Sequence, residues 1–249
     1  MSDPVRDIAN AVLYEGHMLW PYRPSALKNR QRWTFGGVYP PAYAAATSDR
    51  SRVSCQCLAE GDAPRFGIAV RFLLQDVERS VSIGEIDDPP GRVEAAVVEL
   101  EPGLHRLALT VENTSPWSGT DRNEAMRHTL ASAHAVLTVE GGAFRSAIDS
   151  PELLSQDGLW PVLVGEPGTT TLASPIILPD YPQVAPESPG DFFDGCEIDQ
   201  LLVLNILALT DEEKAEIRDG DPRARAILER TEAMAPKDLM RLHGTWREP

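Results

Sequence analysis

Four carboxylates lie close together in one short stretch of the chain: Asp191, Asp194, Glu197 and Asp199. Carboxylate oxygens at this density are the ligands that hard divalent cations prefer. The spacing departs from that of an EF-hand calcium loop, because the alternating aspartates and the terminal glutamate are missing. The same residues suit turns and a helix cap before a helix or strand at 198–207. We therefore predict no metal site and keep the four carboxylates as a candidate surface for a protein partner.

These carboxylates belong to a longer acidic stretch, because no lysine or arginine occurs between Arg145 and Lys214. Prolines interrupt the stretch repeatedly, most densely within residues 174–202. An acidic surface without its own counter-charges suits a basic partner or a basic segment of the same chain.

Residues 16–48 form the opposite kind of segment, since they contain no acidic side chain. Basic residues alternate there with aromatic ones, and the residues of interest are Arg23, Lys28, Arg30, Arg32 and Trp33. Such segments bind nucleic acid or anions in some proteins. The net charge of −15 and the lack of a nucleic-acid-binding motif argue against nucleic acid. We expect this segment either to bind an anion or to pair with the acidic residues 174–202 of the same chain.

Cys55 and Cys57 stand two apart in an expected strand, so both thiols point to the same face. Together with Cys196 and a histidine they would supply the ligands of a tetrahedral zinc site. A single C-x-C pair is a weak zinc signature, and cysteine is often buried as a small apolar residue. Burial is the prediction, and no metal or cofactor is expected.

Familiar catalytic motifs are missing from the sequence. It contains no HExxH motif, nucleophile elbow, phosphate-binding loop or dinucleotide-binding glycine motif, and its five histidines are scattered. The residues favour a non-catalytic protein over an enzyme. The alternative is an enzyme or small-ligand-binding protein with an unfamiliar site between the sheet and the Pro-rich loops.

The middle of the chain has the pattern of β-strands separated by Gly, Pro and Asp turns. This regular spacing predicts an α+β fold with a mainly antiparallel, sandwich-like core from about residue 53 to residue 178. A hairpin is expected to turn at Gly141–Gly142. The expected strands lie within residues 53–60, 66–81, 91–100, 105–114, 159–168 and 170–178.

Helices are expected at both ends of the chain. Ile8 and Val12 share one face of a helix over residues 5–14, and a second helix is expected over 120–132. The C-terminal tail carries three helix starts: a capping box at Thr210 and Glu213, Asp221 followed by Pro222, and Pro236.

These elements suggest two regions. Residues 1–209 form an α+β core with the N-terminal helix and the basic aromatic segment, and residues 210–249 form a helical tail packed on that core. No apolar run approaches the ~20 residues that span a bilayer, and the N-terminus lacks the order of a secretory signal. With three cysteines and no implied disulfide framework, the chain is expected to be cytoplasmic.

Several blocks together resemble a bacterial family encoded alongside oxygen-tolerant NiFe-hydrogenases of the actinobacterial type. The blocks are LYEGHMLWPYRPSALKNRQRWTFGGVYP, VEGGAFRSAID, WPVLVGEPG, SPIILPDYPQVAPESPGDFFDGCEIDQLL and LTDEEKAEIRDGDPRARAILERTEAM.

This resemblance implies a hydrogenase accessory role, in which the chain assists maturation or assembly by binding a hydrogenase subunit or another protein of the same gene cluster. The chain lacks the His-rich tracts, CxxC pairs and nucleotide loops of metal-delivery proteins. A protein-binding assembly factor is therefore favoured over a metal carrier.

Overall fold

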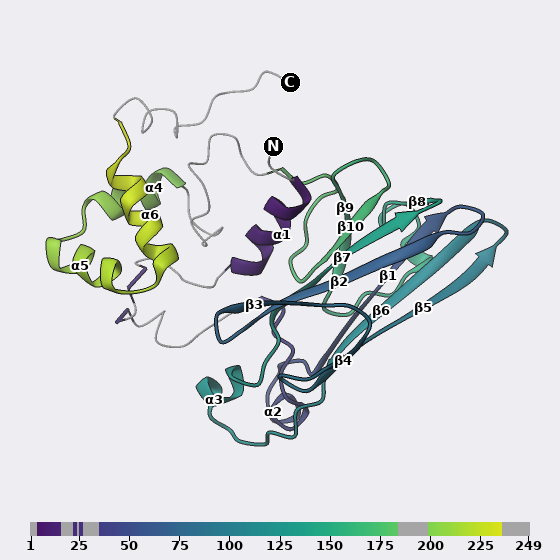
Figure 1. Cartoon of the computed structure of the whole chain (residues 1–249), viewed down its shortest axis with the longest axis horizontal. Helices are drawn as coiled ribbons and strands as arrows, with labels where there is room; N and C mark the ends of the chain where they lie inside the picture. The colour runs from purple at the N-terminus through teal and green to yellow at the C-terminus, as the bar shows by residue number, and fades with distance from the viewer. Residues whose placement is uncertain (1–3, 16–21, 24, 27–34, 184–198, 236–249) are drawn as a thin grey trace. The chain divides into compact units, whose positions relative to one another are not determined.

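The computed structural model describes residues 4–15, 22–23, 25–26, 35–183 and 199–235 (Figure 1). The chain forms two compact units, one of Met1–Leu13 with Thr34–Gln183 and one of Tyr14–Trp33 with Val184–Pro249. The expected division after residue 209 falls inside the second unit. The reason is that α4 (Asp199–Leu207) shares an apolar core with the helices that follow it.

Within the described residues of the first unit, strands form two five-stranded antiparallel sheets (Figure 1). The first sheet has the order β4-β5-β6-β1-β8, and the second has the order β3-β2-β7-β10-β9. The predicted α+β fold with mainly antiparallel sheets is confirmed. The strands are β1 (Arg52–Glu60), β2 (Arg65–Leu74), β3 (Val77–Val81), β4 (Gly84–Ile86), β5 (Gly91–Glu101), β6 (Leu104–Asn113), β7 (Ala131–Glu140), β8 (Ala143–Phe144), β9 (Trp160–Val164) and β10 (Thr170–Ser174).

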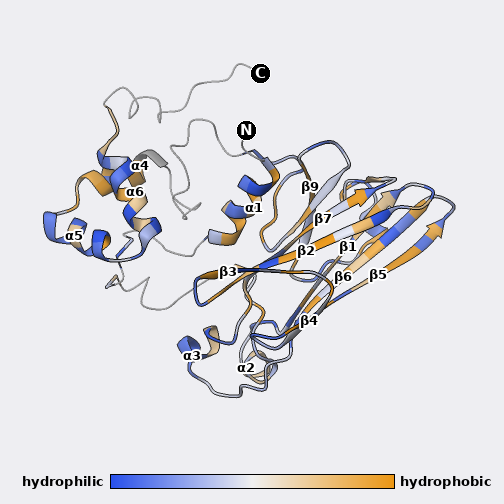
Figure 2. Cartoon of the chain, in the orientation of Figure 1, coloured by the Kyte–Doolittle hydropathy of each residue, from blue (hydrophilic) through white to orange (hydrophobic). Residues whose placement is uncertain are grey.

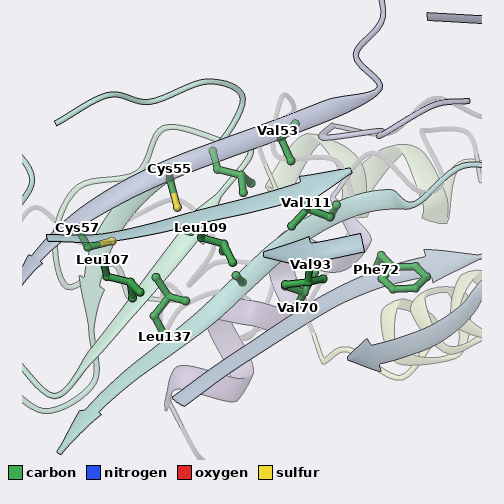
Figure 3. Close-up of a cluster of buried hydrophobic side chains, with 14 of the residues drawn as sticks. Val53, Cys55, Cys57, Val70, Phe72, Val93, Leu107, Leu109, Val111 and Leu137 are labelled. Carbon is green, nitrogen blue, oxygen red and sulfur yellow. The ribbon is translucent and has the colours of Figure 1, made fainter. Parts of the chain in front are cut away.

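The main core lies between the two sheets (Figure 3). Because side chains alternate along a strand, β6 turns Leu107 and Leu109 inward, where they meet Val70 and Phe72 of β2 and Leu137 of β7. Burying each of these side chains stabilises the fold by about 1.5–3 kcal/mol. The single shared cluster shows that the sheets pack face to face as a sandwich.

Helix α1 (Pro4–Tyr14) covers the outer face of the second sheet. Its buried residues Ile8 and Val12 pack against Val162 and Val164 of β9 and Leu172 of β10. The expected apolar stripe of this helix is confirmed, and its packing explains why β9 and β10 are buried on both faces.

The chain turns at Gly141–Gly142 as expected, but the expected hairpin is wrong. β8 pairs with β1 through Ala59 and Phe144, so the chain leaves the second sheet and joins the first. The turn at Gly141–Gly142 lies close to the turn that follows β1. A Cβ atom on Gly142 would lie only 2.4 Å from the carbonyl oxygen of Glu60, the last residue of β1. Because glycine has no Cβ atom, Gly142 allows its turn to reach the end of β1.

Near one end of the sandwich are two short helices, α2 (Pro41–Ala46) and α3 (Arg122–Met126). α3 is shorter than the helix expected over 120–132, although Asp121 caps it by accepting a hydrogen bond from the Glu124 N–H. The chain leaves the helix because the His128 carbonyl accepts a 2.6 Å hydrogen bond from Asn113 Nδ2. Leu130 then forms a bridge with Val38.

The second unit contains α4, α5 (Asp211–Asp219) and α6 (Pro222–Glu232) around a separate apolar core. The capping box of Thr210 and Glu213 and the start of α6 at Asp221–Pro222 are confirmed. Residues 199–207 are helical, which settles the choice between helix and strand there. The helix expected from Pro236 lies outside the described residues.

Candidate protein-binding surface

The four carboxylates predicted to bind a partner are placed only in part. Asp199 is the first residue of α4, whereas Asp191, Asp194 and Glu197 lie outside the described residues. Their role stays a prediction.

The basic aromatic segment contacts helix α5 where it is described. Arg23 Nη1 lies 3.1 Å from Glu213 Oε1, and both the backbone N–H and the hydroxyl of Ser25 donate to the Glu216 carboxylate at 2.9 Å. These two hydrogen bonds lower the pKa of Glu216. Glu213 and Glu216 lie beyond the acidic residues 174–202 named in the prediction. The remaining members, Lys28, Arg30, Arg32 and Trp33, lie outside the described residues.

Cys55 and Cys57 are both buried on the inner face of β1, as predicted (Figure 3). A hydrogen bond with Cys55 and burial raise the pKa of the Cys57 thiol well above its ordinary value. Metal ligation needs the thiolate, so this setting favours the protonated, apolar state. Among the described residues no group of three or more His, Cys, Asp or Glu side chains is placed to hold a metal ion.

His134 is a buried polar residue that the sequence did not single out. Its Nδ1 lies 2.8 Å from the Ser132 carbonyl, which can only accept, so Nδ1 carries the proton. Burial lowers the pKa of His134 to about 4, and its Nε2 has no hydrogen-bond partner within the described part of the chain. Arg71, which pairs with His134 across β2 and β7, donates to Asn10 of α1 at 2.7 Å. The bond from Arg71 to Asn10 joins α1 to the sheet. The His134 side chain is fully buried, so solvent does not reach it.

Aromatic side chains gather where α2 and α3 meet. Tyr39 stacks on Tyr43, and Arg122 both covers the Tyr39 ring and donates to its hydroxyl at 3.0 Å. Burial raises the pKa of Tyr39 to about 12, and Arg122 also lies 3.6 Å from Asp49. These side chains contact one another, so we interpret the cluster as a structural one that packs α2 and α3 together.

The outer edge of β1 is closed by a side chain. Gln156 Oε1 accepts from the Gln56 N–H at 3.0 Å, and Gln156 Nε2 donates to the Gln56 carbonyl at 2.8 Å. The side-chain amide thus replaces a neighbouring strand at this point. On either side of it, Asp157 pairs with Ser54 and Arg145 with Leu58 through backbone hydrogen bonds.

Among the residues that the structure describes, no strand covers most of the opposite edge of the first sheet. β4 pairs only with Gly91–Val93 of β5, and β5 then continues to Glu101 as the outermost strand. Figure 2 shows hydrophobic residues along this strand. Val97 and Val98 are each 49% exposed, although both stand in the middle of a long strand. An outermost strand leaves every second N–H and C=O outside the ladder, which makes it a template for another strand.

A depression with a volume of about 570 Å³ lies beside the first residues of β4. Its floor contains the small residues Ala96 and Ala108, and Ile83, which is well exposed, stands beside it. The charged side chains of Arg92, Glu94 and Glu85 also line it. Arg92 Nη1 lies 3.2 Å from Glu94 Oε1, and Arg92 Nε lies 3.6 Å from Glu85 Oε1. The open edge and the depression form one continuous surface, which we call the β5 edge (Ile83–Glu85 and Arg92–Glu101).

No protein-family model matches the chain, and no curated protein matches it significantly. Among the described residues, no helix is both long enough and apolar enough to cross a membrane.

Proposed function

We propose that this chain is a non-enzymatic, cytoplasmic accessory protein that assists maturation or assembly of a NiFe-hydrogenase through protein–protein contacts. The β5 edge is the observation that carries the protein-binding part of this proposal. A long, partly apolar outermost strand is a recurrent docking element, because its free backbone groups supply hydrogen bonds to an incoming chain.

The second unit offers further support through α4. Leu201 and Leu204 of this helix are exposed, while Leu202 and Ile206 are buried in the core that α4 shares with α5 and α6. Exposed apolar side chains grouped on one element are typical of surfaces that bind another protein. The hydrogenase as partner rests on the sequence blocks that resemble the hydrogenase-associated family.

The proposal is tested by deleting the gene in a host that makes the hydrogenase. We expect the hydrogenase subunits to be expressed but poorly matured or poorly assembled. The purified chain should capture a hydrogenase subunit or its precursor, identified by mass spectrometry. Capture should weaken as salt is raised if acidic residues take part.

The four predicted carboxylates provide the matched variant. Reversing Asp191, Asp194, Glu197 and Asp199 together should abolish capture while the melting temperature is retained. Full hydrogen uptake in the deletion strain would rule out the accessory role, and turnover of a small metabolite by the pure protein would support an enzyme instead.

A further inference from the structure

We propose that the β5 edge binds an extended segment of the partner protein in which apolar and basic side chains alternate, and that this segment adds a strand to the first sheet. This inference rests on the proposed function, since it specifies how the partner is recognised.

Strand addition follows from how the first sheet ends. β4 occupies the edge of β5 only as far as Val93, which pairs with Gly84. From Glu94 onward the same edge has no strand beside it in the described part of the chain. A segment placed there would continue the line of β4 and satisfy the backbone groups that point away from β6.

The alternation follows from the two faces of β5. Val97 pairs with Leu107, which belongs to the core, so Val97 faces the interior side of the sheet. Ala95, two residues earlier in the strand, faces the same side. Ala95 is partly buried against the core, whereas Val97 is half exposed at its rim. Since directly paired residues share a face, the inward side chains of an added strand would cover Val97 and should be apolar.

The basic character follows from the carboxylates on the outward face beside the start of the free run. Glu94 and Glu85 line the depression on the outward face. Glu99 lies on the interior side with Val97 and accepts a hydrogen bond from the Gly103 N–H at 3.1 Å. The nearest base, Arg92, is shared between Glu85 and Glu94. Lysine or arginine on the outward side of an added strand, placed beside Glu94, would therefore meet two carboxylates that share one arginine, in a chain whose net charge is −15.

The same geometry argues against a second copy of this chain as the occupant. A two-fold pairing centred between Val97 and Val98 sets Glu94 of each copy against Glu101 of the other. A pairing centred on Ala96 instead drives Glu99–Glu101 of the second copy into the place held by β4. In addition, the register of β5 shifts between Glu99 and Glu101, which bends the end of the edge.

Binding of fluorescent peptides to the full chain tests this inference. The probe is a short peptide in which valine and lysine alternate, long enough to cover Glu94–Val98. The controls are a scrambled peptide of the same composition and an alternating peptide with glutamate in place of lysine. We expect the alternating lysine peptide to bind at least about tenfold more tightly than either control. Hydrogen exchange should show new protection in β5 and none in β3.

Matched variants locate the site. Val97→Lys and Glu94→Lys should each weaken peptide binding by about tenfold. Val77→Lys should leave it unchanged, because Val77 lies on β3, an outermost strand of the second sheet, and is 50% exposed against 49% for Val97. Glu60→Lys is the control for Glu94→Lys, since each loses one arginine partner at 60% and 58% side-chain exposure.

Three outcomes overturn the inference: equal binding of the alternating and scrambled peptides, equal loss in Val97→Lys and Val77→Lys, or concentration-dependent dimerisation that Val97→Lys abolishes. Capture of a hydrogenase subunit that Val97→Lys leaves intact would also reject the β5 edge while the proposed function stands. Peptide binding at β5 without any capture of a hydrogenase subunit would support the β5 edge and reject the proposed function.

Discussion

Asn113 joins three separate backbone segments at the end of β6. Its Nδ2 donates to the carbonyls of Val38 and His128 at 2.9 and 2.6 Å, and its Oδ1 accepts from the Ser115 N–H at 2.9 Å. The side chain is fully buried, and its partners Val38 and Ser115 are buried as well. One amide thereby fixes where α3 ends and where β7 can begin.

Replacing this amide should destabilise the fold. We expect Asn113→Ala to lower the free energy of unfolding by about 3 kcal/mol, because buried backbone groups lose their partners. Chemical denaturation measures the effect. The control is Asn123→Ala on the exposed surface of α3, which should change stability by no more than about 0.5 kcal/mol. Similar losses in the two variants would contradict the role assigned to Asn113.

His134 should make stability depend on pH. Its pKa is about 4 in the folded chain because of burial and about 6.5 when unfolded, so the unfolded state binds the proton more readily. The stabilisation is complete above about pH 6.5 and is lost progressively as the pH falls toward 4, by about 3 kcal/mol in total.

The measurement for His134 is the free energy of unfolding as a function of pH. His134→Asn keeps an N–H that can donate to the Ser132 carbonyl but does not titrate in this range. The difference between the two proteins should shrink by about 3 kcal/mol between pH 6.5 and 4. Parallel curves would show that His134 does not remain neutral in the fold.

At the scale of elements, α5 depends on the reciprocal hydrogen bonds at its start. Thr210 Oγ1 accepts from the Glu213 N–H at 3.2 Å, and Glu213 accepts from the Thr210 N–H at 3.0 Å. The same Glu213 pairs with Arg23, so the start of α5 also orders part of the basic aromatic segment.

Thr210→Ala should therefore cost about 1 kcal/mol of stability, the usual effect of losing a helix cap. Thr210→Ser keeps the hydroxyl and should behave like the natural chain, which makes it the matched control. Both can be measured by thermal unfolding followed by circular dichroism. If the serine variant loses as much as the alanine variant, the methyl group matters and the cap does not.

The strands could be predicted because alternation and turn residues are local properties. β1 and β6 show this, as does the inward placement of Cys55 and Cys57. The position of β8 could not be predicted, because its pairing with β1 depends on contact between two distant turns. The open β5 edge was missed for a similar reason. The run GRVEAAVVELE indicates a strand, but only the order of strands in the sheet shows that it is outermost.

At the scale of the whole molecule, the net charge of −15 should oppose compactness through self-repulsion. We expect the melting temperature to rise by about 2–4 °C between low and physiological salt, which corresponds to about 1 kcal/mol for a chain of this size. Differential scanning calorimetry in sodium chloride measures it. A fall in melting temperature would mean that surface ion pairs outweigh the repulsion.

The Gln156 amide that closes β1 has a consequence for polymer growth. Strand-by-strand growth of a sheet into a fibril requires two accepting edges on each copy, so that every addition creates a new place to add. In the first sheet the β1 side is occupied by the chain's own side chain and loop backbone. Within the described part of the chain this sheet therefore offers copies of the protein one accepting edge, at β5, and two copies joined there would have no edge of this sheet left for a third.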